Sequence, residues 1–315
     1  MIKMIDSVWN ICNEFIKDGK GRHVALVDAG MIPLAEKIKT ELVDVKDHWW
    51  GYPKCFNKDT TRDLDYKMMF YELIADSVNY QYWYGRHDVR PNGACADNMY
   101  KLLNEAFSFV EKQYGDNESG CTGYEGCRLV AGYFKESISL NRYPNLENRM
   151  KHIDEVNSLI NTRGQDTIKY LSDEIVNNNI SIDNFLQIVV NKLPGYAEDM
   201  FLKRAFLLPI MLYRRLQWFK NEVEVLPVPA DYQIPKILEG LGCINYDYIL
   251  SEKIQNGELI PAGSLEECEI RAATMLAGKR LAELSGHTMC DIDTYLWLKR
   301  NEIDKPFHLT ITTNY

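Results

Sequence analysis

Apolar residues recur at three- and four-residue steps along most of this chain, which is the spacing that places side chains on one face of an α-helix. The ranges that show this pattern are 34–43, 65–83, 98–114, 146–161, 166–176, 183–192 and 265–284. Segments with strand character are fewer: residues 22–27 form an apolar run, and residues 309–313 include β-branched side chains. The pattern therefore predicts a mostly α protein with a few short strands.

A short helix is predicted to follow Asp231 and Tyr232. Pro235 suits the first turn of such a helix, because its fixed φ is helical and no backbone N–H is needed there. Gly242 is a typical C-terminal stop. A carboxylate is then held rigidly at a helix start, beside an aromatic ring, and such an acid can stabilise a sugar cation. The same pattern is typical of an N-terminal helix cap followed by a packed tyrosine.

A second group of candidates lies in the predicted helix 65–83. Asp76, Asn79, Tyr80 and Trp83 are spaced at i, i+3, i+4 and i+7, so a helix places them on one face. A face of carboxylate, amide, phenol and indole is a poor core stripe, because each polar group needs a partner. It is a good lining for a cavity that holds a polar, ring-containing ligand. A partly exposed amphipathic helix accounts for the same pattern.

Lys203 and Arg204 precede a strongly apolar helical segment. A cation anchored at the start of a buried helix is a natural ligand for a phosphate group. Charge pairs near helix ends are equally common, so a structural role for this pair stays open.

Composition and charge narrow the function classes. The formal net charge of −9 argues against an extended nucleic-acid surface, which needs a basic stripe. The eight cysteines include no Cys-x-x-Cys pair, and no histidines cluster at metal-ligand spacing, so we expect reduced thiols and no metal. The most apolar run, residues 206–213, is too short to cross a bilayer, and no apolar signal segment opens the chain. We therefore expect a cytoplasmic protein that does not contact a membrane.

Several segments in register resemble one known family. They are Asp-Tyr-x-x-Pro at 231–235, Glu-x-Glu-Ile-Arg at 267–271, Asp-x-x-Leu-Trp at 293–297, Pro-x-His at 306–308, and the upstream segments 75–83, 193–196 and 203–205. In this order and spacing the chain resembles the queuosine salvage family, the queuosine 5′-phosphate N-glycosidases. The resemblance is strongest over residues 185–315 and weaker over 66–110.

The resemblance implies a fold and an activity. The fold is a single large helical domain over residues 1–315, on a scaffold like that of DNA glycosylases, with 1–145 and 146–315 as two lobes. The activity is hydrolysis of the N-glycosidic bond of queuosine 5′-monophosphate, which releases queuine and ribose 5-phosphate. No cofactor or metal is implied, and the partner is this small nucleotide, not a nucleic acid.

The resemblance also implies roles for the candidate residues. Asp231 is the catalytic carboxylate beside C1′, where it stabilises positive charge and deprotonates the attacking water. Tyr232 packs against the sugar or base, and Lys203 binds the phosphate. His48 matches a histidine in a pre-helix loop of the family. The face of Asp76, Asn79, Tyr80 and Trp83 lines the substrate pocket.

The expected base makes a particular demand on the site. Queuine is a 7-deazapurine, so the protonation at N7 that purine N-glycosidases use is not available, and donors to O6 or N3 must replace it. A guanine-like edge and a cationic side chain each require a carboxylate, and the acids of the matching motifs, Asp76, Asp231, Glu269 and Asp293, fit that need. For two of them we favour a structural role, and we interpret Glu269 as an ion-pair partner of Arg271. We interpret Asp293 as a helix cap, with Trp297 in the core.

The sequence departs from the family in places and leaves other hypotheses open. Gln233 stands where an arginine is frequent, Leu309 follows His308 in place of an arginine, and residues 114–130 look like an insertion. A glycosidase for a related nucleoside or nucleotide, or a non-catalytic binder of 7-deazaguanine nucleotides, is therefore an alternative. A nucleic-acid glycosylase on a related scaffold is disfavoured by the acidic balance.

Overall fold

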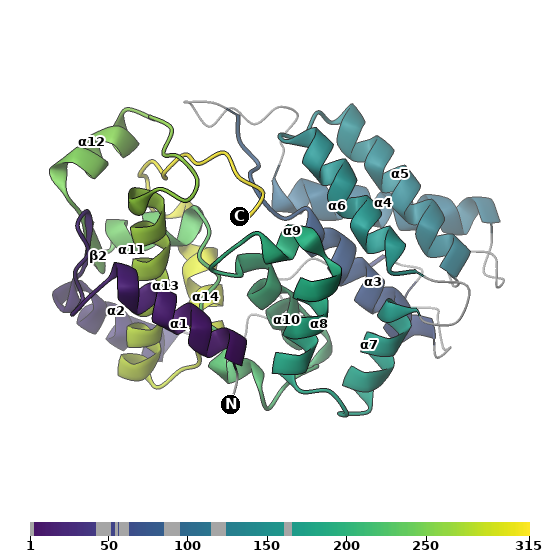
Figure 1. The fold of residues 1–315 in the computed structure, drawn as a ribbon, viewed down its shortest axis with the longest axis horizontal. Coiled ribbons are helices and arrows are strands. Elements are labelled where there is room, and N and C mark those ends of the chain that lie inside the picture. Colours follow the sequence, from purple (N-terminus) through teal and green to yellow (C-terminus); the bar gives the residue numbers. More distant parts are fainter. Residues whose placement is uncertain are drawn as a thin grey trace.

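The computed structural model describes residues 3–41, 52–53, 56, 63–84, 95–114, 124–160 and 166–315. The described chain is mostly helical, as the apolar pattern predicts (Figure 1). Its one sheet has two antiparallel strands, β1 (Val24–Leu26) and β2 (Ile244–Tyr246). The strand predicted at 22–27 is thus confirmed. The one predicted at 309–313 is wrong, because only a single bridge from Leu309 to Leu259 forms there.

Each of the seven ranges with helical spacing of apolar side chains overlaps a helix, and further helices, such as Lys3–Phe15 and Tyr124–Leu140, lie outside those ranges. In chain order they are α1 (Lys3–Phe15), α2 (Asp28–Glu41), α3 (Asp63–Ser77), α4 (Ala96–Tyr114), α5 (Tyr124–Leu140), α6 (Leu146–Ser158), α7 (Thr167–Val176), α8 (Ile182–Lys192), α9 (Pro194–Ala197), α10 (Lys203–Leu216), α11 (Gln233–Gly240), α12 (Tyr248–Gln255), α13 (Leu265–Ser285) and α14 (Met289–Leu298), with 3-10 turns η5 (Val223–Val225) and η6 (Lys299–Asn301).

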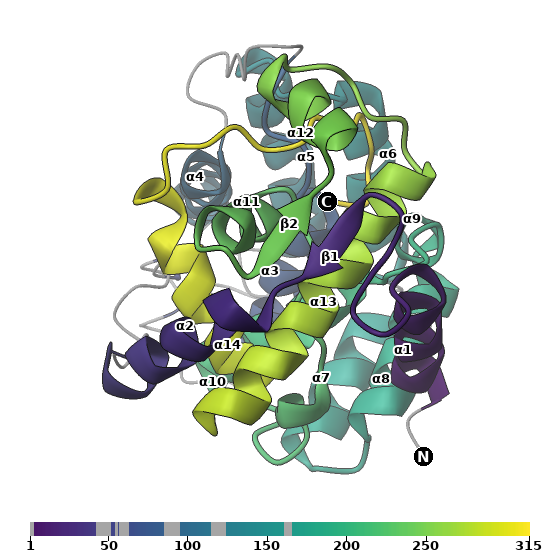
Figure 2. The ribbon, with the colours of Figure 1, turned by 90° about the vertical axis from the view of Figure 1, so that its left-hand side faces the viewer.

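The helices pack in two groups that each surround one buried helix. Helix α13 contacts α1, α2, α11, α14 and both strands, and Figure 2 shows the two-stranded ribbon beside it. Helix α3 contacts α4, α5, α6, α7 and α10. The first elements of the chain therefore pack against its last third, while the middle of the chain surrounds α3 (Figure 1). The division into lobes at residue 145 stays a prediction.

Two charged residues of α13 fix its neighbours. The Glu269 carboxylate accepts backbone N–H groups from residues 22–24 and so holds the start of β1. Arg271 donates two hydrogen bonds to Asp199, at 2.7 and 2.8 Å. The expected Glu269–Arg271 ion pair is therefore wrong, because residues two apart on a helix point in different directions.

Helix α3 ends at Ser77 and does not extend to Trp83 as predicted. The N–H groups of Val78 and Asn79 make tight-turn bonds to the carbonyls of Ala75 and Asp76, and the residues beyond run as irregular chain. Asn79, Tyr80 and Trp83 therefore do not share a helix face with Asp76.

Three buried cationic side chains replace the hydrogen bonds that a longer helix would have made. Arg204 donates to the carbonyl of Ser77 at 2.6 Å, and Lys203 donates to that of Asn79 at 3.0 Å. Arg149 donates to the carbonyls of residues 78, 80 and 81. Because a buried carbonyl without a donor is costly, these cations stabilise the termination of α3 at Ser77.

Arg149→Met should destabilise the protein by about 3 kcal/mol or more, because several buried carbonyls lose charged donors at once. Chemical denaturation of the full chain measures the change. The matched control is Arg142→Met, at an exposed position, where surface changes are usually within about 0.5 kcal/mol. Equal effects of the two substitutions would contradict this account of the end of α3.

Candidate active site

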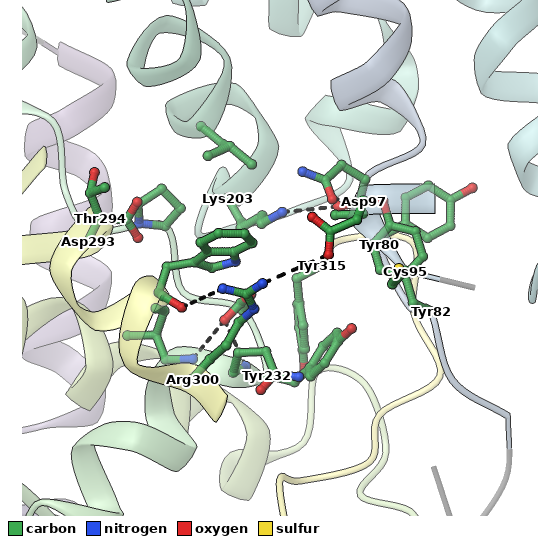
Figure 3. A pocket seen from close by; sticks show the side chains of 18 of the residues that line it. Tyr80, Tyr82, Cys95, Asp97, Lys203, Tyr232, Asp293, Thr294, Arg300 and Tyr315 are labelled. Atoms are coloured by element: carbon green, nitrogen blue, oxygen red, sulfur yellow. Dashed lines mark hydrogen bonds and ion pairs between the residues drawn. The ribbon is translucent and has the colours of Figure 1, made fainter. Parts of the chain in front are cut away.

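A cavity of about 280 Å³ opens where the two groups of helices meet. Its walls come from the segment after α3, the start of α4, the start of α10, the segment 229–234, α14 with η6, and Tyr315 (Figure 3). These elements are distant in sequence, so the cavity exists only in the folded chain. Its volume lies just below the range of about 300–1,000 Å³ that is typical of small-molecule sites.

The structure brings five of the predicted site residues together around this cavity. Its lining includes Asn79, Tyr80, Lys203, Asp231 and Tyr232. The irregular chain after α3, and not a helix face, therefore presents Asn79 and Tyr80 to the cavity.

Asp76 and Trp83 do not line the cavity, and His48 lies outside the described residues. Asp76 is fully buried, and its Oδ2 accepts a hydrogen bond from the hydroxyl of Tyr196 at 2.7 Å. Burial raises the pKa of Asp76 to about 7, against the opposing pull of Lys203. Trp83 packs against Phe307, in a small apolar cluster beside the cavity.

Asp231 both caps α11 and faces the cavity. Its Oδ1 accepts the backbone N–H groups of Gln233 and Ile234, at 2.8 and 2.9 Å. Asp231 therefore caps the first N–H groups of α11 from one residue before the N-cap position, which is Tyr232. Its Oδ2 makes no hydrogen bond to any described residue and stays available to a ligand. Burial raises the pKa of Asp231, while Lys203 and the two N–H groups oppose that rise.

Tyr232 supports the same corner of the cavity. Its ring packs on Phe307, with the ring centroids 4.6 Å apart, and only 6% of the residue is exposed. The packed-tyrosine interpretation is confirmed, and the ring also forms part of the cavity wall.

Lys203 is a buried ammonium among carboxylates. It begins α10, is 5% exposed, and lies within the electrostatic influence of Asp76, Asp231 and Asp293. Burial lowers its pKa, although the three acids oppose that shift. The predicted role as phosphate ligand stays a prediction, and the surroundings favour a second role as the counter-ion of these acids.

Asp293 is a site residue that the sequence analysis counted among the acids of the family motifs but interpreted as a helix cap. The N-cap of α14 is Thr288, whose side chain and Asp291 form a capping box, so the expected cap at Asp293 is wrong. Asp293 lines the cavity and makes no hydrogen bond to a described residue. Burial and the negative charge of Asp231 raise its pKa to about 7. Trp297, one helical turn later on the same face, also lines the cavity.

Further lining residues carry no local sequence signal, because they come from separate elements. Arg300 lies in η6, Asp97 and Tyr100 lie in α4, and Tyr315 accepts the N–H of Gln81 through its backbone carbonyl. In the part of the chain that the structure describes, no group of three His, Cys, Asp or Glu side chains is arranged to hold a metal ion. No described helix is both long and apolar enough to span a membrane.

Fold and cavity together define a helical protein with a small cavity lined by carboxyl groups and aromatic rings. A sequence profile of the queuosine salvage protein family matches residues 59–315, and the chain belongs to this family.

Three proteins with similar sequences have the same name. The chain is 27% identical to a queuosine 5′-phosphate N-glycosylase/hydrolase of Sphaerobacter thermophilus, over 78% of this chain and 80% of that protein. It is 28% identical to the protein of that name from Dictyostelium discoideum, over 55% and 59% of the two chains. The one from Bos taurus is 22% identical, over 81% and 78%.

Asp76→Asn should make stability less sensitive to pH. The pKa of Asp76 is raised to about 7 in the folded protein, so ionisation opposes folding, and the wild type loses that part of its stability as the pH rises from about 4 to 7. The free energy of unfolding of the variant, relative to wild type, should therefore increase over this range in denaturation experiments.

Asp199→Asn is the matched control with the opposite sign. Burial opposes ionisation of Asp199, but Arg271 and two backbone N–H groups together hold its pKa below the usual value. The wild type gains from this carboxylate as the pH rises through the acid range, so the variant should lose relative stability there. Parallel pH profiles for the two variants would contradict the assignments.

Proposed function

We propose that this chain hydrolyses the N-glycosidic bond of queuosine 5′-monophosphate and releases queuine and ribose 5-phosphate. The observation that carries the proposal is the placement of Asp231. One of its oxygens is fixed by two backbone N–H groups, and the other is free toward a cavity that holds a second carboxyl, Asp293. Membership of the queuosine salvage family supports the substrate class.

Asp231 supplies the negative charge that cleavage of the glycosidic bond requires. Positive charge grows on the sugar in the transition state, and a fixed carboxylate beside C1′ stabilises it without having to reorganise. The same oxygen accepts a proton from the attacking water. Its rigid hydrogen bonds to the start of α11 keep it in position during both steps.

Asp293 is the carboxyl of this site that stays protonated more readily. Two neighbouring carboxylates do not both ionise readily in a buried place. Lys203 favours the charged form of both carboxyls, but Asp231 also has two backbone N–H donors, whereas Asp293 has no hydrogen-bond donor among the described residues. Asp293 therefore holds its proton to higher pH and donates it to N3 or N9 of the departing 7-deazapurine, whose carbon at position 7 cannot take one.

The remaining lining residues bind and orient the nucleotide. Tyr80 and Tyr232 supply aromatic surface, and Asn79 supplies polar groups beside them. Asp76 and Trp83 act from behind the wall, through Lys203 and Phe307 respectively. His48 stays a predicted substrate ligand. The proposal includes action on the free nucleotide in the cytoplasm. None of the six described cysteines forms a disulfide, which fits a reducing compartment.

The wild-type chain should release free queuine from queuosine 5′-monophosphate and none from intact queuosine-containing tRNA. Asp231→Asn should retain nucleotide binding but lose two or more orders of magnitude in kcat, about 3 kcal/mol of transition-state stabilisation. Chromatography of the free base measures release, and calorimetry measures binding. The control is Asp154→Asn, at an exposed ion pair with Lys135. Tight binding without release by the wild type would show a binder and refute the enzyme.

Asp293→Asn should remove one limb of the pH profile. If protonated Asp293 is the proton donor, kcat of the wild type falls as the pH rises through about 7. The variant should be slower by about 100-fold and lack this fall. The quantity to compare is kcat at saturating substrate, because the substrate phosphate itself titrates near pH 6. A fall of the same shape in the variant would assign the proton to another group.

A further inference from the structure

A second hollow adjoins the cavity. It is a groove of about 630 Å³ that runs along α11, the end of α12 and the segment 303–309. The cavity and the groove have Gln233, Arg300 and Asn301 in common. We call these three residues the shared wall. A ligand whose reacting end lies in the cavity can therefore extend over the shared wall into the groove.

The two hollows differ in charge. The cavity is lined by three acids, Asp97, Asp231 and Asp293, against two cations, Lys203 and Arg300. The groove is lined by three cations, Lys236, Arg300 and Lys305, against one acid, Asp304. Lys305 is paired with Glu239 at 2.6 Å, but the cations still outnumber the acids when this partner is counted. A ligand with a cationic or developing positive end and an anionic end is thus oriented with its anion toward the groove. Queuosine 5′-monophosphate is such a ligand.

Arg300 is held in place on the shared wall. Its guanidinium carbon lies 3.4 Å from the centroid of the Trp297 ring, and its Nη1 donates to the carbonyl of Trp297 at 3.0 Å. Its own carbonyl accepts a hydrogen bond from Lys236 at 2.7 Å. Figure 3 shows Arg300 reaching across the cavity toward Asp97, with 4.0 Å between Nη2 and Oδ2. This long ion pair to an exposed carboxylate is weak, and a phosphate can replace it.

Gln233 supports the placement of the sugar beside this wall. Its Oε1 is buried and has no hydrogen-bond partner in the described part of the chain. A buried acceptor without a donor is costly, and a ribose hydroxyl can supply one. The sugar then lies between Asp231, two residues earlier, and Arg300.

The other cationic features near Asp231 suit a phosphate less well. Lys203 lies among Asp76, Asp231 and Asp293, so a phosphate dianion there would meet two cavity carboxylates at close range. The N-terminal N–H groups of α11 already bind the Asp231 carboxylate.

We propose that Arg300, stacked on Trp297 at the shared wall, binds the 5′-phosphate of the substrate and makes the site selective for the nucleotide over the nucleoside. This inference rests on the proposed function for the identity of the substrate. It assigns the phosphate to the rim of the cavity, and it leaves Lys203 as the counter-ion of the acids.

Arg300→Gln removes the charge and keeps planar N–H donors. It should lower kcat/KM for queuosine 5′-monophosphate about 10- to 100-fold and change that for queuosine less than about twofold. The matched control is Arg280→Gln, which removes an arginine that pairs with Asp28 and Glu283 on the surface of α13, and it should leave both values unchanged. An unchanged ratio in Arg300→Gln, or a collapse of the ratio in Lys203→Met instead, overturns the inference while queuine release still supports the enzyme.

Calorimetric titration with ribose 5-phosphate tests the phosphate site without turnover. The wild type should bind ribose 5-phosphate more tightly than ribose, and Arg300→Gln should lose the difference. If the wild type releases no queuine but shows this binding, the proposed function fails and the phosphate site stands. If Arg300→Gln binds ribose 5-phosphate as the wild type does, the phosphate assignment is wrong.

Discussion

The Lys203 ammonium is the charge on which the rest of the site depends. It donates to the carbonyl of Asn79, where α3 has ended, and it lies among Asp76, Asp231 and Asp293. A buried cation is costly unless it is paired and hydrogen-bonded, so the end of α3 and the starts of α10 and α11 must be arranged around it. The same ammonium lets two neighbouring carboxyls exist in one small cavity. Fold stability and the chemistry of the site therefore rest on one buried cluster.

The local parts of this arrangement could be predicted from the sequence, and the tertiary parts could not. A proline in the first turn and a preceding acid predict the start of α11, and Asp231 caps that helix as such residues do. The end of α3 depends on Arg149, Lys203 and Arg204, which lie far along the chain, so an amphipathic pattern that runs on past Ser77 gives no sign of it.

The roles of the acids in the site also could not be assigned from the sequence alone. The sequence around Asp293 fits a helix cap as well as a ligand-binding acid, and only its position in the cavity with Asp231 separates the two roles. The sequence around Arg300 and around Asp97 carries no recognisable functional motif. The two residues meet only because η6 and α4 line the same cavity. Two adjoining hollows of opposite charge are a property of the assembled fold. They match a ligand that is positive at its reacting centre and negative at its 5′ end.

The most direct measurement is a crystal structure of the Asp231→Asn variant with queuosine 5′-monophosphate bound. The account predicts that C1′ lies beside the side chain of residue 231, with a water about 3–3.5 Å from C1′. The base should lie against Asp293, and the phosphate should be on Arg300 at the shared wall. A nucleotide bound with its phosphate on Lys203, or with its sugar remote from residue 231, would contradict the account.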